Sequence, residues 1–299
     1  MQLIRLLITG VSLLIAGAVP AAPLTVLVSL LPQKYFAERI GGEHVAVSVL
    51  VGPGRSPENY EPTMQQMSRL GATRLFWRMG LPFEEVLTQR LFADKSTLTL
   101  LDAREGLTLR SMENLAIVLD VDEGNEAGHD LDHHHDHEGL DPHIWLNPHN
   151  VKHMGELFMN ALVHLDPGHA ESYQRNYQHF IQELEQLDQD IRALLDGLEQ
   201  HRFMVFHPAW GYFADAYGLR QIPIEIEGKS PGPKTLAAII QLAREEQIKV
   251  IFVQQQFSQR DAQTVAKAMH GAVVAVDPLA ENYPANLLAV ARAFAEAMR

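Results

Sequence analysis

The chain of 299 residues contains no cysteine. An exported protein without cysteine has no disulfide bonds and is stable through packing alone. The same absence excludes a lipid anchor on an N-terminal cysteine. Basic residues are also scarce, with 24 Lys and Arg against 37 Asp and Glu and a formal net charge of −13. This balance argues against binding to nucleic acid and against electrostatic attachment to anionic lipid, because both of those surfaces are negatively charged.

Long apolar runs are absent outside the N-terminal segment. That segment has Arg5 near its start, an apolar run from Leu6 to Val19 and a small-residue cleavage pattern, Val19-Pro20-Ala21. These features predict a secretory signal peptide over residues 1–21. The alternative is an uncleaved membrane anchor, but the run is shorter than the roughly 18 residues of a spanning helix. A signal peptide without a lipidated cysteine predicts a mature protein that is free in the periplasm.

Histidine is concentrated between residues 129 and 149, and residues 129–138 form a low-complexity His/Asp run that predicts a flexible loop. Its imidazoles suit zinc, copper, nickel or iron, and the alternative is a solvated polar loop that binds metal only incidentally. The histidines of this auxiliary loop are His129, His133, His134, His135 and His137. His143 is different, because it lies among large apolar residues between Pro142 and Pro148. It is either a metal ligand or a core histidine bonded to the backbone.

Apolar, β-rich runs alternate with helical patterns in both halves of the chain. The predicted strands are 24–31, 44–51, 74–77, 98–102, 202–206, 221–226, 250–254 and 272–276. The predicted helices are 32–40, 64–70, 83–91, 150–165, 235–246, 260–269 and 286–298. This alternation predicts an α/β protein with two lobes, each a mostly parallel sheet flanked by helices.

One long helix is predicted between the two halves. Asp166-Pro167 is a strong helix start, and apolar residues then recur every three or four positions from Tyr173 to Leu198. A helix from 167 to 199 would be about 50 Å long. It forms either a coiled coil or a link across two lobes, and the link is favoured because no second heptad segment exists. The predicted division is a signal peptide (1–21), an N-terminal lobe (22–165), a linker helix (166–200) and a C-terminal lobe (201–299).

Four acidic or imidazole side chains stand at predicted strand or loop ends, each followed closely by proline: Glu58, His143, His207 and Asp277. Two fall in each half, as a site between two lobes requires. Mixed His and carboxylate ligation suits zinc and also harder ions such as manganese. Each residue also has an ordinary structural interpretation. Glu58 could be a surface acid, His207 a helix cap or core residue, and Asp277 a turn residue before Pro278.

At these residues the sequence resembles the periplasmic metal-binding receptors of ABC transporters for zinc and manganese, the ZnuA-like or TroA-like group. The resemblance covers almost the whole mature chain. Its motifs are SPENYEPT (56–63), RMGLPFEEVL (78–87), LDPHIWLNP (140–148), FHPAWGYFADAYGL (206–219), IPIEIEGKSPGPKTL (222–236), VIFVQQQFS (250–258) and VDPLAENY (276–283). It implies two α/β lobes joined by a long helix, with a metal ion held between them by three histidines and a carboxylate.

The resemblance assigns His143, His207 and Asp277 to three positions of that ligand set. The fourth departs from the family pattern, because Glu58 stands where the family's first-lobe histidine is expected. If Glu58 coordinates, the site has two imidazoles and two carboxylates, which is harder and moves selectivity towards manganese or iron. If it does not, water or a histidine of the 129–137 run completes the shell. Zinc is the first choice, because the His-rich loop accompanies zinc members of the family in particular.

The predicted function is therefore capture of Zn²⁺, with Mn²⁺ as the alternative, and delivery to a cognate ABC permease by a monomeric receptor without enzymatic activity. Because ligation requires neutral imidazoles, affinity is expected to fall below about pH 6.5. A secreted zinc hydrolase is the main rival, with Glu58 as general base, but the chain has no H-E-x-x-H motif. A metallochaperone that uses mainly the His-rich loop is a third possibility.

Overall fold

The computed structural model describes residues 22–93, 98–113, 139–225, 231–256 and 259–299. The predicted signal peptide (1–21) and the predicted His-rich loop (129–138) lie outside these residues. Within the described part, no helix has the length and apolar character needed to cross a membrane.

Helices and strands follow the predicted order, with ends that shift by a few residues. The strands are β1 (Leu24–Val28), β2 (Val45–Val49), β3 (Leu75–Arg78), β4 (Thr99–Asp102), β5 (Arg202–Val205), β6 (Arg220–Pro223), β7 (Val250–Gln254) and β8 (Ala272–Val276). The α-helices are α1 (Leu31–Gly41), α2 (Met64–Arg69), α3 (Pro82–Ala93), α5 (Pro148–Leu165), α6 (Ala170–Leu195), α7 (Gly211–Tyr217), α8 (Pro233–Glu245), α9 (Gln259–Ala268) and α10 (Tyr283–Ala297). Helix α7 has no counterpart among the predicted elements. Short 3₁₀ helices are η1 (Gly42–His44), η2 (Leu70–Ala72), η3 (Ile144–Leu146) and η4 (Pro167–His169).

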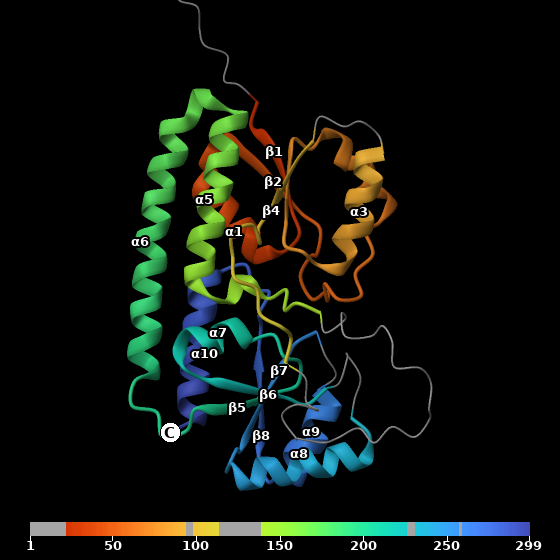
Figure 1. Cartoon of the computed structure of the whole chain (residues 1–299), viewed down its shortest axis with the longest axis vertical. Coiled ribbons are helices and arrows are strands. Elements are labelled where there is room, and N and C mark those ends of the chain that lie inside the picture. The colour runs from red at the N-terminus through yellow and green to blue at the C-terminus, as the bar shows by residue number, and fades with distance from the viewer. Residues whose placement is uncertain (1–21, 94–97, 114–138, 226–230, 257–258) are drawn as a thin grey trace, which may run out of the picture.

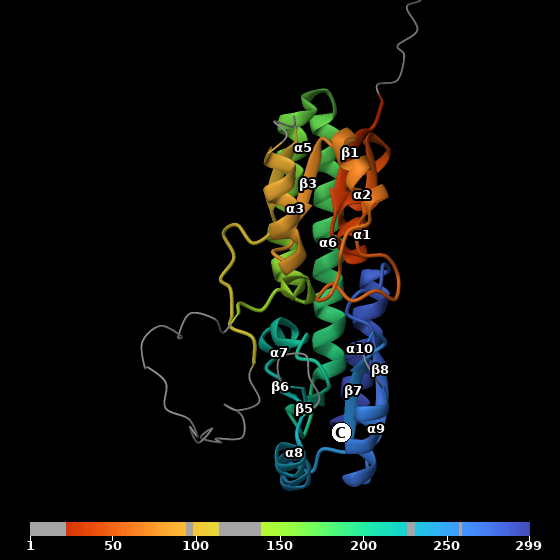
Figure 2. The same cartoon turned by 90° about the vertical axis from the view of Figure 1, so that its right-hand side faces the viewer.

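The strands form two four-stranded parallel sheets, in the orders β2-β1-β3-β4 and β6-β5-β7-β8. The two orders are equivalent, since in each sheet the first strand of the half lies between the second and the third. Figures 1 and 2 show the two sheets one above the other, each with helices packed beside it. The predicted α/β fold class is confirmed. In such sheets ligands bind beyond the carboxyl ends of the strands, where the strand order reverses.

Helix α6 runs along both halves, as the linker prediction requires (Figure 1), and contacts α1 and α5 of the first half and α10 of the second. It is shorter than predicted, because its first turn is the 3₁₀ helix η4 and it ends at Leu195. Its 26 residues span about 40 Å. The predicted apolar stripe includes Leu194 after Ile191, but Leu194 is only partly covered, and Leu195, four residues after Ile191, is buried instead. Gly197, with φ of 68°, turns the chain away after the helix.

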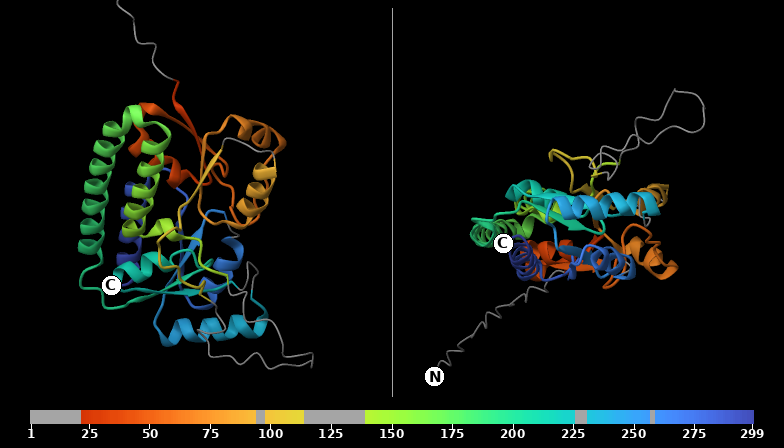
Figure 3. Two further views of the ribbon diagram at one scale, coloured as in Figure 1. Left: turned by 45° about the horizontal axis from the view of Figure 1, so that its top comes forward. Right: turned by 90° about the horizontal axis from the view of Figure 1, so that it is seen from below.

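A continuous apolar core crosses the boundary between the halves. It extends from β1 and β3 through α5 and α6 to β5 and α10. In the first half Trp77 stacks on Phe158 with 4.4 Å between ring centroids, and in the second Phe203 lies 4.4 Å from Phe294. A smaller cluster lies between the second sheet and helices α8 and α9, at the end of the molecule away from the first half (Figure 3). The proposed lobe boundaries remain a prediction, but the shared core joins both halves into one packed unit.

Candidate metal site

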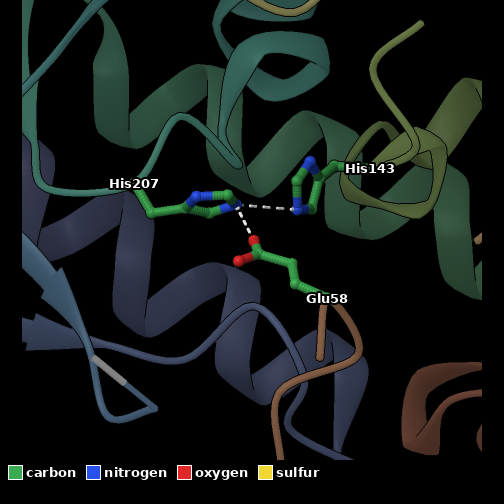
Figure 4. Close-up of side chains that lie close together, drawn as sticks. All are labelled: Glu58, His143 and His207. Atoms are coloured by element: carbon green, nitrogen blue, oxygen red, sulfur yellow. Dashed lines mark hydrogen bonds and ion pairs between the residues drawn. The ribbon is translucent and has the colours of Figure 1, made fainter. Parts of the chain in front are cut away.

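Three of the four predicted ligands come together between the halves: Glu58, His143 and His207 (Figure 4). One ligating atom of each lies within 4.8 Å of the others. Nε2 of His207 is 2.6 Å from Oε1 of Glu58 and 3.4 Å from Nε2 of His143. The structure thus brings the predicted imidazole pair and the substituted glutamate to one point.

Each of the three side chains comes from a different part of the chain. His207 lies two residues after β5, His143 directly precedes η3, and Glu58 lies in the Gly/Pro-rich loop after β2. That loop is fixed by Tyr60, whose hydroxyl donates to the carbonyl of Leu50 at 2.6 Å. The two histidines are buried, with side chains 6% exposed, whereas Glu58 is 38% exposed. The site is therefore reached from the side of the Glu58 loop.

His143 is held by a carboxylate two residues before it. Oδ1 of Asp141 lies 2.8 Å from Nδ1 of His143 and accepts the backbone N–H of the same residue at 2.9 Å. Because Asp141 occupies Nδ1, the other ring nitrogen of His143 is left to face His207. Two residues further on, the Trp145 indole donates to the carbonyl of Pro278 at 2.8 Å, which ties this loop to the second half.

His207 is held in the same way by a carboxylate that lies two residues after β6. Its Nδ1 lies 2.5 Å from Oε1 of the buried Glu225, while its Nε2 faces Glu58. Burial lowers the pKa of His207, but hydrogen bonds with Glu225 and Glu58 outweigh this and raise the pKa to about 9. For Glu58 the effect of burial is opposite, because burial raises the pKa of a carboxyl group. The contact with His207 outweighs burial, and the pKa of Glu58 is lowered overall. In the metal-free protein His207 therefore carries a proton between two carboxylates at neutral pH.

The spacing of the two imidazole nitrogens fits a tetrahedral zinc ion, whereas Oε1 of Glu58, at 2.6 Å from Nε2 of His207, lies at hydrogen-bond distance. Two nitrogens at about 2.05 Å from zinc in tetrahedral geometry are about 3.3 Å apart, and the two Nε2 atoms are 3.4 Å apart. Histidine ligands of zinc usually donate their second ring N–H to a carboxylate or carbonyl, as both histidines do here. The pocket at this point has a cavity volume of about 10 Å³, and its lining includes Glu58, His143, Gln254 and Gln256. This space suits a single small species rather than an organic molecule.

Asp277, the fourth predicted ligand, lies at the edge of this pocket and outside the group of three. Its Oδ1 accepts the backbone N–H of Leu279 at 2.9 Å and a side-chain N–H of Gln256 at 3.2 Å. Leu279 and Gln256 both line the pocket, so Asp277 is one residue removed from it. Ligation by Asp277 stays a prediction. The histidines of the auxiliary loop lie outside the described residues.

Asp141 and Glu225, the two supporting carboxylates, were not among the predicted site residues. Asp141 had a local signal, because it lies two residues before His143, a spacing at which a short carboxylate bonds both the backbone and the ring. Glu225 had a weaker one, as an acid at the end of an apolar strand. Only the fold reveals that it meets His207, 18 residues earlier in the chain.

Comparison with known proteins finds one matching family and similar solved structures. A family described as ZnuA, zinc-uptake complex component A, periplasmic, matches residues 26–297. A crystal structure of ZnuA has a TM-score of 0.82 and 35% identity, over 93% of this chain and 100% of that one. A zinc-bound deletion variant of ZnuA gives 0.81 and 36%, over 92% and 98%.

Sequence relatives are more distant. A protein of Chlamydia muridarum described as metal-binding is 28% identical over 273 residues, 91% of this chain and 90% of its own length. Zinc-binding protein AdcA of Streptococcus pyogenes is 28% identical over 266 residues, which cover 85% of this chain. That match covers 50% of AdcA, so the chain spans about half the length of that relative.

Proposed function

Because the chain belongs to the ZnuA family of periplasmic zinc-uptake components, we propose that it captures a zinc ion outside the inner membrane and delivers it to an ABC permease. The observation that carries this proposal is the convergence of Glu58, His143 and His207 on one point between the halves. Members of the family bind a metal ion and work with an ABC permease. The cognate permease, a monomeric state and export by residues 1–21 are parts of the proposal.

The proposed ligands are His143, His207 and Glu58, with Asp277 as the fourth. Oδ1 of Asp277 accepts from Leu279 and Gln256, so a small movement of the loop after β8 is required to bring its carboxylate to the ion. The shared core and the continuous helix α6 resist wide opening of the halves. Loading and release therefore involve loop rearrangement and small shifts rather than a large hinge motion. The residues of the His-rich loop (129–138) act as an auxiliary collector of the ion.

Zinc is favoured over manganese as the cargo. Imidazole nitrogen suits zinc better than manganese, and both buried ligands are imidazoles. The zinc-bound ZnuA variant and the zinc-binding AdcA relative also support zinc. Glu58 in place of histidine adds negative charge to the site without removing the nitrogen pair.

Removal of both buried histidines tests the proposal. The purified wild-type protein is expected to retain one equivalent of zinc through gel filtration, and the variant His143→Ala with His207→Ala is expected to retain none. The matched control is His179→Ala with His201→Ala, two exposed histidines away from the site, which should keep the equivalent. Undiminished zinc in the site variant would overturn the proposal. Robust turnover in a hydrolysis screen of the zinc-loaded protein would favour the rival hydrolase instead.

A further inference from the structure

The guanidinium group of Arg110 lies between Asp141, two residues before His143, and helix α7 of the second half. The side chain of Arg110 is 19% exposed and meets three carboxylates. It lies 3.3 Å from Oδ2 of Asp141, 2.8 Å from Oε1 of Glu113 and 3.0 Å from Oδ2 of Asp215 in α7. The fork of N–H donors on arginine allows one side chain to serve several carboxylate oxygens at once, which lysine cannot do with the same geometry.

The first contact of Arg110 leads to His143. Asp141 uses Oδ2 for Arg110 and Oδ1 for the backbone and ring of His143. A fully buried carboxylate is costly unless it is paired and hydrogen-bonded. Arg110 pairs with Oδ2 of Asp141, so that Oδ1 is left to hold Nδ1 of His143.

The second contact leads towards His207. Glu113 accepts from Arg110 with one oxygen and from the side chain of Gln221 with the other. Gln221 is fully buried and also donates to the carbonyl of Pro208 at 3.1 Å. Pro208 directly follows His207, so this chain of hydrogen bonds ends at the backbone that presents the second imidazole.

The backbone around Arg110 is fixed to both halves as well. Ser111 and Leu140 form an antiparallel bridge, and Asp141 N–H donates to the carbonyl of Arg110 at 2.9 Å. The N–H of Arg110 donates to the hydroxyl of Tyr212 at 3.1 Å. Segments on either side of the His-rich region are therefore paired with each other and anchored on α7.

Close approach of Arg110 to α7 depends on a glycine. A Cβ placed on Gly211 would lie 1.2 Å from Nη1 of Arg110 and 2.9 Å from Oδ2 of Asp141. Both atoms are the ends of side chains, so an alanine at this position displaces the guanidinium, crowds the carboxylate that it pairs with, and leaves the helix backbone in place. This gives a second way to remove the same contact.

We propose that Arg110 is a positioning residue of the metal site, which orients His143 through Asp141 and steadies the backbone after His207 through Glu113 and Gln221. The proposal rests on the zinc-binding function proposed above and names the group that aligns the two imidazoles across the halves. The position of the Arg110 side chain also requires Gly211, because only a residue without a side chain leaves room for the guanidinium.

The test compares Arg110→Gln, Gly211→Ala and their combination in the full-length protein. Loss of a supporting group typically weakens metal affinity by about 10-fold to 100-fold, and this loss is expected for each single variant in competition with a chromophoric zinc chelator. The loss in the double variant should be smaller than the sum of the two single losses, because both changes act on the contact between Arg110 and Asp141. Zinc stoichiometry stays at one.

A spectroscopic readout separates positioning from general destabilisation. In the zinc-free wild type, ring ¹⁵N shifts should report a single tautomer of His143 with the proton on Nδ1. A second tautomer should appear in Arg110→Gln and in Gly211→Ala. The control is Arg104→Gln, because Arg104 pairs with Asp102 within the first half and should change neither readout. Thermal unfolding identifies a variant that fails to fold, and the other single variant then decides.

Wild-type affinity and an unchanged tautomer in Arg110→Gln would overturn the inference. So would a double variant whose loss equals the sum of the two single losses. If the wild type itself bound no stoichiometric zinc, the proposed function would fail, and the tautomer of His143 would still show whether Arg110 orients the ring.

Discussion

The two halves have the same strand order, and each contributes one buried histidine whose Nδ1 meets a buried carboxylate. The halves differ in the groups that pair with that carboxylate. In the first half Asp141 is paired with Arg110 and accepts two hydrogen bonds from His143. In the second half Glu225 bonds His207 through one oxygen, and its other oxygen is buried and has no hydrogen-bond partner among the residues that the structure describes.

The difference means that the two imidazoles hold their protons for different reasons. At Asp141 the charge is balanced by arginine, so the ring serves as a hydrogen-bond donor to an already paired carboxylate. At Glu225 the ring itself is the balancing cation, and Glu58 adds a second negative charge on the other side. The second half therefore carries the proton that zinc must displace, whereas the first half presents a ring held in place by its own loop.

The pH dependence of zinc affinity is the largest effect expected from this difference. Zinc needs the Nε2 lone pair of His207, and the pKa of about 9 keeps that nitrogen protonated at neutral pH. With one proton released per zinc, affinity should fall about tenfold per pH unit as pH decreases below 9, or about 100-fold between pH 9 and 7. An ordinary imidazole would start this decline only below about 6.5. Chelator competition across this range checks the slope, and calorimetry in two buffers counts the proton. A constant affinity between pH 7 and 9 would contradict the expectation.

The supporting carboxylates should then separate the two halves. Asp141→Asn and Glu225→Gln are each expected to weaken zinc binding by about 10-fold or somewhat more, as loss of a supporting partner does. Only Glu225→Gln should also move the decline in affinity to lower pH, because it removes a hydrogen bond that raises the pKa of His207. Affinity measured against pH for both variants makes this comparison. Equal shifts in the two variants would show that the proton is not confined to the second half.

Local patterns in the sequence predicted the fold well. Alternation of β-rich and amphipathic segments gave the α/β class and the order of the elements, because each of these patterns depends on neighbours in the chain. Helix α7 was missed since seven residues are too few to show a helical period. The end of α6 was placed too far along because Leu198, which is also buried, continues the apolar spacing beyond the turn at Gly197.

The site was predicted in part, for a related reason. His143 and His207 stood out by residue type and by the prolines that follow them, and the fold brings them to 3.4 Å. Partners that act across the fold gave no comparable signal: Arg110 meets α7 about a hundred positions away in the chain. Ligation by Asp277 depends on where its loop holds the carboxylate, which accepts the N–H of Leu279. Residue type alone does not decide this position.

The two proposed ligand carboxylates provide the last contrast between the halves, and Asp277 has the smallest expected effect. Glu58 already touches His207, so Glu58→Gln should weaken zinc binding by about tenfold or more. Asp277 lies outside the group of three, and Leu279 and Gln256 hold its Oδ1, so its loop must move before the carboxylate reaches the ion, and the cost of this movement offsets part of what its ligation contributes. Asp277→Asn should therefore weaken binding by less than Glu58→Gln, with a loss below about tenfold. Chelator competition at one pH ranks the two variants. A larger loss for Asp277→Asn would show that the second half supplies the stronger carboxylate ligand and that the loop after β8 moves readily onto the ion.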